Sequence, residues 1–156
     1  FIELSEVENM KEGLTRFIEA QEVQEDGYSC ALSEIKNGRK KSHWIWYIFP
    51  QIEGLGNSEM CQRYGIRGLD EAKAYLAEPI LRSRLVEICE ALLSLDANDA
   101  TEVMGGGKLG RIDRRKLQSS MTLFNEATES IDVFQKVLNK YFNGEKDDRT
   151  LKMLGM

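Results

Sequence analysis

The sequence is poor in histidine, cysteine and proline, and it has no long hydrophobic run. His43 is the single histidine among 156 residues, and Cys30, Cys61 and Cys89 are the three cysteines. No Cys or His ligands stand at the short spacing that a zinc site requires, so we expect no metal. An odd number of widely spaced cysteines does not suit a disulfide framework and favours free thiols in a reducing cytosol.

The low proline content and the short apolar stretches narrow the class of protein further. The two prolines are Pro50 and Pro79, and such a low count favours helices over rigid loops. The longest apolar stretch, Trp44 to Pro50, is far shorter than the roughly 20 residues that span a bilayer. The acidic N-terminus lacks the apolar segment of a signal peptide. The sequence therefore predicts a cytoplasmic protein with no membrane partner and no cofactor.

The net charge of −5 is distributed unevenly along the chain. Six basic and two acidic residues lie between positions 36 and 67, and five basic residues and one acid lie between positions 108 and 116. A general nucleic-acid binder is usually basic overall, so the acidic total argues against a nucleic-acid partner. Two short basic segments in an acidic protein suit a small anionic ligand. The alternative is that both segments are ordinary solvated surface.

Apolar residues recur at helical spacing along most of the chain, with capping residues and glycines between the segments. This pattern predicts an all-α fold: one compact domain over residues 1–156, with about eight to nine helices. The expected segments are residues 5–24, 28–36, 44–49, 58–64, 70–77, 79–95, 98–104, 113–127 and 130–141, with a terminal turn at 148–154. The expected capping residues are Ser5 with Glu8, Ser58, Asn98 or Asp99, and Ser130.

The segment Ser42–Gln51 holds the histidine and both tryptophans and follows a basic run. An unperturbed histidine titrates near neutral pH, so His43 is the candidate catalytic acid or base. Trp44 and Trp46 are candidates to stack on a flat ring of a ligand. The alternative is a structural histidine among aromatic side chains that fill the core, because such residues bury large apolar areas.

A second candidate segment begins at Lys116, with Ser119 and Ser120 at i+3 and i+4 on neighbouring rows of a helix. A lysine beside hydroxyls suits a phosphate or a sugar, but Ser120 is equally a small core residue whose hydroxyl bonds the preceding turn. The glycines at 105–107 do not match a P-loop, which leaves a weak anion site or a flexible surface loop. The candidate ligand-binding residues are Lys41, Ser42, Trp44, Trp46, Gln51, Lys116, Ser119 and Ser120.

Two long motifs resemble a known family. They are Gly38–Gln51, followed by Gly54-Leu55-Gly56-x-Ser58, and Asp113-x-x-Lys116-Leu117-x-Ser119-Ser120-Met121-Thr122-Leu123-Phe124. Both resemble the bacterial domain-of-unknown-function family numbered 1810, some members of which are labelled calpastatin. The resemblance covers nearly the whole chain and implies a compact helical fold without a settled role. Nothing in the sequence supports protease inhibition, and residues 105–113 are longer than the family pattern, which indicates an insertion.

A fainter similarity, in architecture alone, is to NADAR proteins, helical N-glycosidases that act on ADP-ribose derivatives. Their glutamate-containing catalytic motif has no match here, so this similarity implies a ligand class and no catalytic residue. The first hypothesis is a domain that binds or processes a nucleotide or an ADP-ribose-like anion. The second is a non-catalytic interaction module in which the aromatic motif is core. The sequence does not decide whether any reaction is catalysed.

Overall fold

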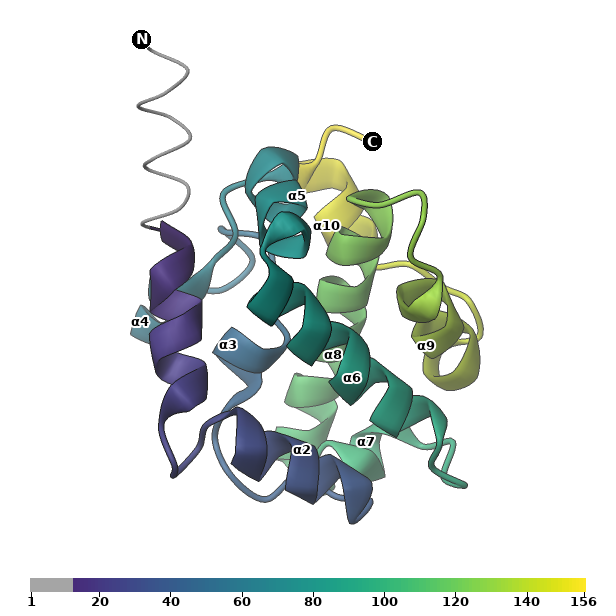
Figure 1. Cartoon of the computed structure of the whole chain (residues 1–156). Coiled ribbons are helices and arrows are strands. Elements are labelled where there is room, and N and C mark those ends of the chain that lie inside the picture. The colour runs from purple at the N-terminus through teal and green to yellow at the C-terminus, as the bar shows by residue number, and fades with distance from the viewer. Residues whose placement is uncertain (1–12) are drawn as a thin grey trace, which may run out of the picture.

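Helices dominate because apolar residues recur every three to four positions, while glycines and polar caps end each run. The computed structural model describes residues 13–156. Within that range, residues 13–22 form the first helix and nine further helices follow (Figure 1). Their bounds are α2 Tyr28–Lys36, α3 Ile45–Ile48, α4 Glu59–Tyr64, α5 Leu69–Ala77, α6 Pro79–Leu93, α7 Ala100–Val103, α8 Gly107–Glu126, α9 Val133–Phe142 and α10 Asp148–Met153.

The all-α class is confirmed. Across residues 13–156, extended pairing is limited to one parallel bridge between Ile52 and Ile66. The expected terminal turn is the helix α10, which explains why the structure has one more helix than the upper number predicted. No helix in this range is long and apolar enough to cross a membrane.

Several helix starts follow the capping rules. Ser58 and Asp99 accept backbone hydrogen bonds at the starts of α4 and α7, and Pro79 takes the first position of α6. The predicted capping box of Ser5 and Glu8 lies outside the described residues. Capping by short polar side chains therefore predicted the starts of α4 and α7 correctly.

The start of α8 differs from the prediction: the helix begins at Gly107, not at Asp113. Gly105, Gly106 and Gly107 all have positive φ, which glycine adopts without steric cost, and they turn the chain sharply from α7 into α8. The segment expected to be a loop after these glycines is therefore the first part of a long helix.

The predicted N-cap of α9 is also wrong. Asp132, not Ser130, precedes the helix. The turn before it is held by Thr128, whose hydroxyl accepts hydrogen bonds from the backbone N–H groups of Ser130 and Ile131. Thr128 thus shapes the turn before α9, while no side chain accepts a capping hydrogen bond at the start of the helix within residues 13–156.

The central helix is α8, which contacts α3, α5, α7, α9 and α10 and runs behind α6 in Figure 1. Its second half, from Leu117 to Phe124, is largely buried in one continuous hydrophobic core. Its first half carries basic side chains and is mostly exposed. The helix therefore brings Lys116 to the boundary between core and surface.

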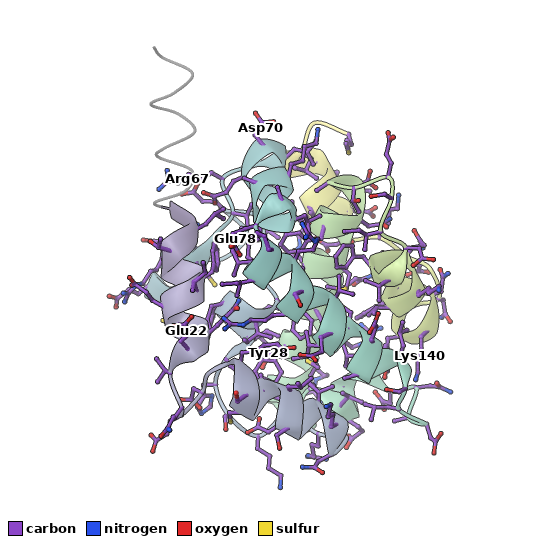
Figure 2. The ribbon with its side chains drawn as sticks, in the orientation of Figure 1. Glu22, Tyr28, Arg67, Asp70, Glu78 and Lys140 are labelled. Atoms are coloured by element: carbon purple, nitrogen blue, oxygen red, sulfur yellow. The ribbon has the colours of Figure 1, made fainter. Side chains whose placement is uncertain are left out.

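Charged side chains hold both ends of α6, the long helix in front of the core (Figure 2). The Glu78 carboxylate accepts a hydrogen bond from the Leu81 backbone N–H over 2.7 Å. The Lys140 ammonium, from α9, donates to the carbonyls of Leu92 at 3.3 Å and Leu93 at 3.0 Å. An acid at the N-terminus and a base at the C-terminus both complement the helix dipole.

Candidate functional site

Glu34 on α2 organises the loop that carries the first motif. Its Oε1 accepts hydrogen bonds from the backbone N–H groups of Lys41 at 2.8 Å and Ser42 at 2.9 Å, and from the indole Nε1 of Trp44 at 2.9 Å. Its Oε2 accepts one from the Ser42 hydroxyl at 2.6 Å. The N–H and O–H groups of this loop therefore donate to the protein's own carboxylate and are not free to hold an external phosphate.

These contacts fix the charge of Glu34. Burial alone raises the pKa of a carboxyl group, but the hydrogen bonds from Ser42, Lys41 and Trp44 outweigh it and lower the pKa of Glu34 to about 2. Glu34 is therefore ionised at neutral pH. Glu34 was not predicted from the sequence, because a lone acid on an amphipathic helix carries no pattern that indicates a role in holding a loop.

Lys40 joins the two motifs. Its buried ammonium lies 3.0 Å from the Asp113 carboxylate on α8 and 5.1 Å from the centre of the Trp44 ring. Beside it, Arg39 donates a 2.7 Å hydrogen bond to the Gly105 carbonyl. The two basic segments of the sequence thus meet in space, one on the loop before α3 and the other on α8.

The second meeting point is the pair formed by Trp46 and Lys116. The Lys116 ammonium lies 5.0 Å from the centre of the Trp46 ring, within the range of a cation–π contact. Among residues 13–156 the buried Trp46 Nε1 has no hydrogen-bond partner, and the same is true of the buried Ser120 hydroxyl. Ser120 stands one helical turn after Lys116, on the same side of α8.

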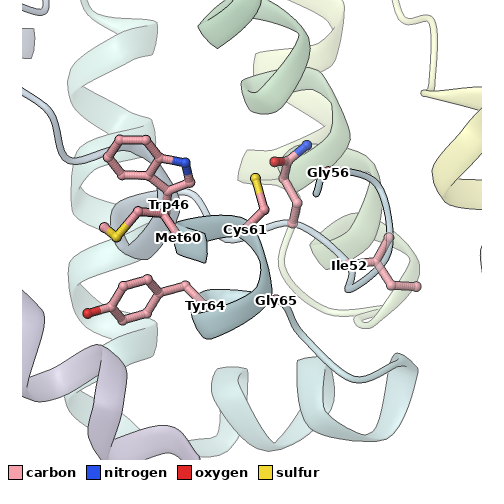
Figure 3. A pocket seen from close by; sticks show the side chains of 8 residues that line it. Trp46, Ile52, Gly56, Met60, Cys61, Tyr64 and Gly65 are labelled. Atoms are coloured by element: carbon pink, nitrogen blue, oxygen red, sulfur yellow. The ribbon is translucent and has the colours of Figure 1, made fainter. Parts of the chain in front are cut away.

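A small recess lies beside Trp46, between the segment 51–56 and α4 (Figure 3). It is shallow and partly open to solvent, with a volume of about 10 Å³. In Figure 3 the Trp46 ring lies next to Met60 and Tyr64, with its indole nitrogen on the side of Cys61. The lining residues are Trp46, Gln51, Ile52, Gly56, Met60, Cys61, Tyr64 and Gly65.

Comparison with known proteins shows which family shares this architecture. A family model described as a protein of unknown function, DUF1810, matches residues 11–154. The chain belongs to the DUF1810 family. It is also similar to the crystal structure of the conserved hypothetical protein Rv1873 from Mycobacterium tuberculosis, with 39% identity and a TM-score of 0.83. That match covers 92% of this chain and 96% of the other, and no curated protein matches the chain.

The DUF1810 fold brings together only some of the candidate residues. Trp46 and Gln51 line the recess, and Lys116 lies over the Trp46 ring. Trp44 is fully buried with its indole held by Glu34, so it presents no face to a ligand. The sequence did not distinguish between the two tryptophans, because both alternation and helical spacing fit this stretch.

The remaining candidates of this DUF1810 chain are placed elsewhere or already engaged. His43 and Lys41 are exposed, and neither lines the recess. The Ser42 hydroxyl is bonded to Glu34. Ser119 is buried and its hydroxyl shares a 2.8 Å hydrogen bond with Thr150 on α10. The structure thus separates His43 from the Trp46 recess.

Metal binding and thiol chemistry depend on where the acidic, histidine and cysteine side chains lie. Among residues 13–156, no cluster of three or more His, Cys, Asp or Glu side chains is arranged to hold a metal ion. Cys30, Cys61 and Cys89 are free thiols, and burial raises the pKa of Cys89 well above the usual range. Cys61 is the cysteine that lines the recess.

Proposed function

We propose that this DUF1810 domain binds a small anion of the nucleotide or ADP-ribose class at the Trp46 recess. The proposal rests on two buried polar atoms, the Trp46 Nε1 and the Ser120 Oγ, that lie close to Lys116 and have no hydrogen-bond partner in the described part of the chain. A buried donor without a partner costs roughly 1–3 kcal/mol. A ligand oxygen that accepts these hydrogen bonds recovers that free energy.

The charge of Lys116 supports an anionic ligand. No carboxylate lies within ion-pair distance of its ammonium among residues 13–156, in contrast to Lys40, which is paired with Asp113. Lys116 is half-buried, so its charge is screened less by water than that of a fully exposed lysine. An anion held beside the Trp46 ring gains both this charge and the indole N–H.

The size of the recess sets which part of a ligand enters it. Its volume of about 10 Å³ is room for about one water-sized group, far below the roughly 300–1,000 Å³ of drug-sized pockets. A single phosphate oxygen or hydroxyl group of a ligand enters that space, not a whole sugar. In this arrangement Gln51 orients hydroxyl groups, Trp46 and Lys116 hold the phosphate, and the rest of the ligand extends over the surface.

Lys116→Met tests the proposal, because it keeps the side-chain length and removes the charge. Isothermal titration of the full chain with ADP-ribose, AMP and ribose 5-phosphate should give binding by at least one compound, weakened more than tenfold by Lys116→Met. The matched control is Lys36→Met, an exposed lysine on α2. No binding by any compound, or equal binding by Lys116→Met and the native chain, contradicts the proposal.

The second candidate, a non-catalytic interaction module, is favoured by the complete burial of Trp44 and its bond to Glu34. Those contacts give Trp44, one of the two tryptophans of the motif, a structural role in the core. His43 is exposed and is not among the residues that line the recess. We therefore propose binding without a reaction, and His43→Ala should leave ligand affinity unchanged in the same titration.

A further inference from the structure

The first half of α8 presents unpaired positive charge. Lys108, Arg111 and Arg115 stand at i, i+3 and i+7 and therefore share one side of the helix. All three are exposed, and none forms an ion pair with another residue in the range 13–156. The other two bases of this segment are engaged, Arg114 over the Phe142 ring and Lys116 over the Trp46 ring.

Two large aliphatic side chains accompany these bases: Ile112 lies among them, and Leu109 lies at the edge of this side, turned away from Arg111. Leu109 is 66% exposed and Ile112 is 41% exposed. Ile112 stands four residues after Lys108 and three before Arg115, so it lies between basic neighbours. We call the surface formed by Lys108, Leu109, Arg111, Ile112 and Arg115 the basic–aliphatic face. Exposed apolar side chains rimmed by charge are typical of an interaction site.

Nearby acids do not cancel the charge of this face. Asp113 is directed inward and paired with Lys40 at 3.0 Å. Glu102, at the end of α7, is paired with Arg39 at 3.0 Å. Both of these acids are thus paired with a base from the loop before α3. The three free bases on the basic–aliphatic face keep their charge for an external partner.

We propose that the basic–aliphatic face binds an acidic segment of a partner protein, with carboxylates paired to the bases and aliphatic side chains packed on Leu109 and Ile112. Charge complementarity and the mixed chemistry of the face carry this assignment. The large exposed apolar side chains of residues 13–156 are aliphatic, so no aromatic platform for nucleic-acid bases lies here. Two aliphatic side chains give only a small apolar area for insertion into a membrane.

The face spans few residues, so we expect a transient complex with a dissociation constant in the micromolar range. The interaction is separate from the Trp46 recess, because none of the five residues of the face lines that recess. A failure of small-molecule binding at the recess therefore does not contradict peptide binding at this face. Likewise, a failure of peptide binding does not contradict ligand binding at the recess.

The test is selection of binding peptides from a phage-displayed library of random dodecapeptides against the full chain. We expect peptides in which Asp and Glu flank Leu, Ile or Val. A fluorescein-labelled copy of the strongest peptide should lose at least tenfold in affinity with Arg111→Glu/Arg115→Glu, measured by fluorescence anisotropy. Leu109→Ser/Ile112→Ser should weaken binding to a similar extent, because both contributions are required.

The matched control is Lys36→Glu/Lys73→Glu, which reverses two exposed lysines on other helices and should bind the peptide normally. Circular dichroism confirms that each variant is folded. Selection of peptides without this acidic–aliphatic pattern, or unchanged affinity in the face variants, overturns the proposal. So does tighter binding of single-stranded DNA or of phosphatidylserine vesicles that is lost with Arg111→Glu/Arg115→Glu.

Discussion

Replacing Glu34 with alanine should lower the free energy of unfolding by about 3–4 kcal/mol, the largest effect that we expect of any single substitution. The native carboxylate accepts hydrogen bonds from two backbone N–H groups, the Ser42 hydroxyl and the buried indole of Trp44. Hydrogen bonds to a charged acceptor are stronger than those between neutral groups. Alanine removes the acceptor and leaves the Trp44 Nε1 without a partner inside the core.

Urea denaturation followed by circular dichroism measures this change. Glu34→Gln is an informative companion, because its amide oxygen still accepts the three bonds made at Oε1, and it should cost less than Glu34→Ala. Glu90→Ala, an exposed acid on α6, should change stability by less than about 0.5 kcal/mol. A loss below about 1 kcal/mol for Glu34→Ala would show that the carboxylate does not hold the loop.

Glu34 also gives the protein an acid-sensitive step. Its pKa is lowered from 4.5 to about 2 in the folded state, so the folded protein binds fewer protons than the unfolded chain in that interval. The stability it contributes is present above pH 4.5 and is lost as the pH falls toward about 2. Glu34→Gln should make the stability curve shallower across this interval, while Glu90→Gln should leave its shape unchanged.

Gly110→Ala should be the second most damaging substitution, at about 2–3 kcal/mol. A Cβ at this position would lie 2.4 Å from the Thr101 carbonyl oxygen, because α8 passes directly against the backbone of α7. Whether Gly110→Ala lowers or raises stability shows whether this position is crowded. In an uncrowded helix interior, alanine is more stable than glycine by about 1 kcal/mol.

Thermal and urea unfolding of Gly110→Ala measure the cost of this close approach. Arg111→Ala, the next residue, has an exposed side chain and should be nearly neutral. A stabilised Gly110→Ala protein would mean that α7 and α8 do not approach as closely as described.

Local patterns predicted most of the helices because their apolar residues recur at helical spacing, and side chains cap α4, α6, α7 and α10. The start of α8 was the main failure, and its cause is physical: Gly107 and Gly110 are poor helix formers. Their presence is explained by tertiary structure, since Gly107 takes a positive φ and Gly110 has no room for a side chain. Neither requirement leaves a mark in a single sequence other than the glycine itself.

The candidate site was predicted in its parts but not in its geometry. Trp46 and Lys116 were chosen by residue type, and their contact joins positions that are far apart in the chain. Trp44 was given the same role as Trp46, yet packing buries one ring and leaves the other at the recess. Glu34 was absent from the prediction because its partners become neighbours only when the loop after α2 folds back.

The central claim is that an anion binds beside Trp46, and the two indole N–H signals of the ¹H–¹⁵N correlation spectrum test it most directly. The Trp44 indole donates to Glu34, whereas the Trp46 indole finds no acceptor among residues 13–156, so the pair contains its own internal control. Trp46→Phe assigns the signals. Titration with ADP-ribose or ribose 5-phosphate should shift the Trp46 signal, leave that of Trp44 in place, and have no effect in Lys116→Met. A Trp46 signal that does not move with any of these ligands, or a shift that survives Lys116→Met, would contradict the account.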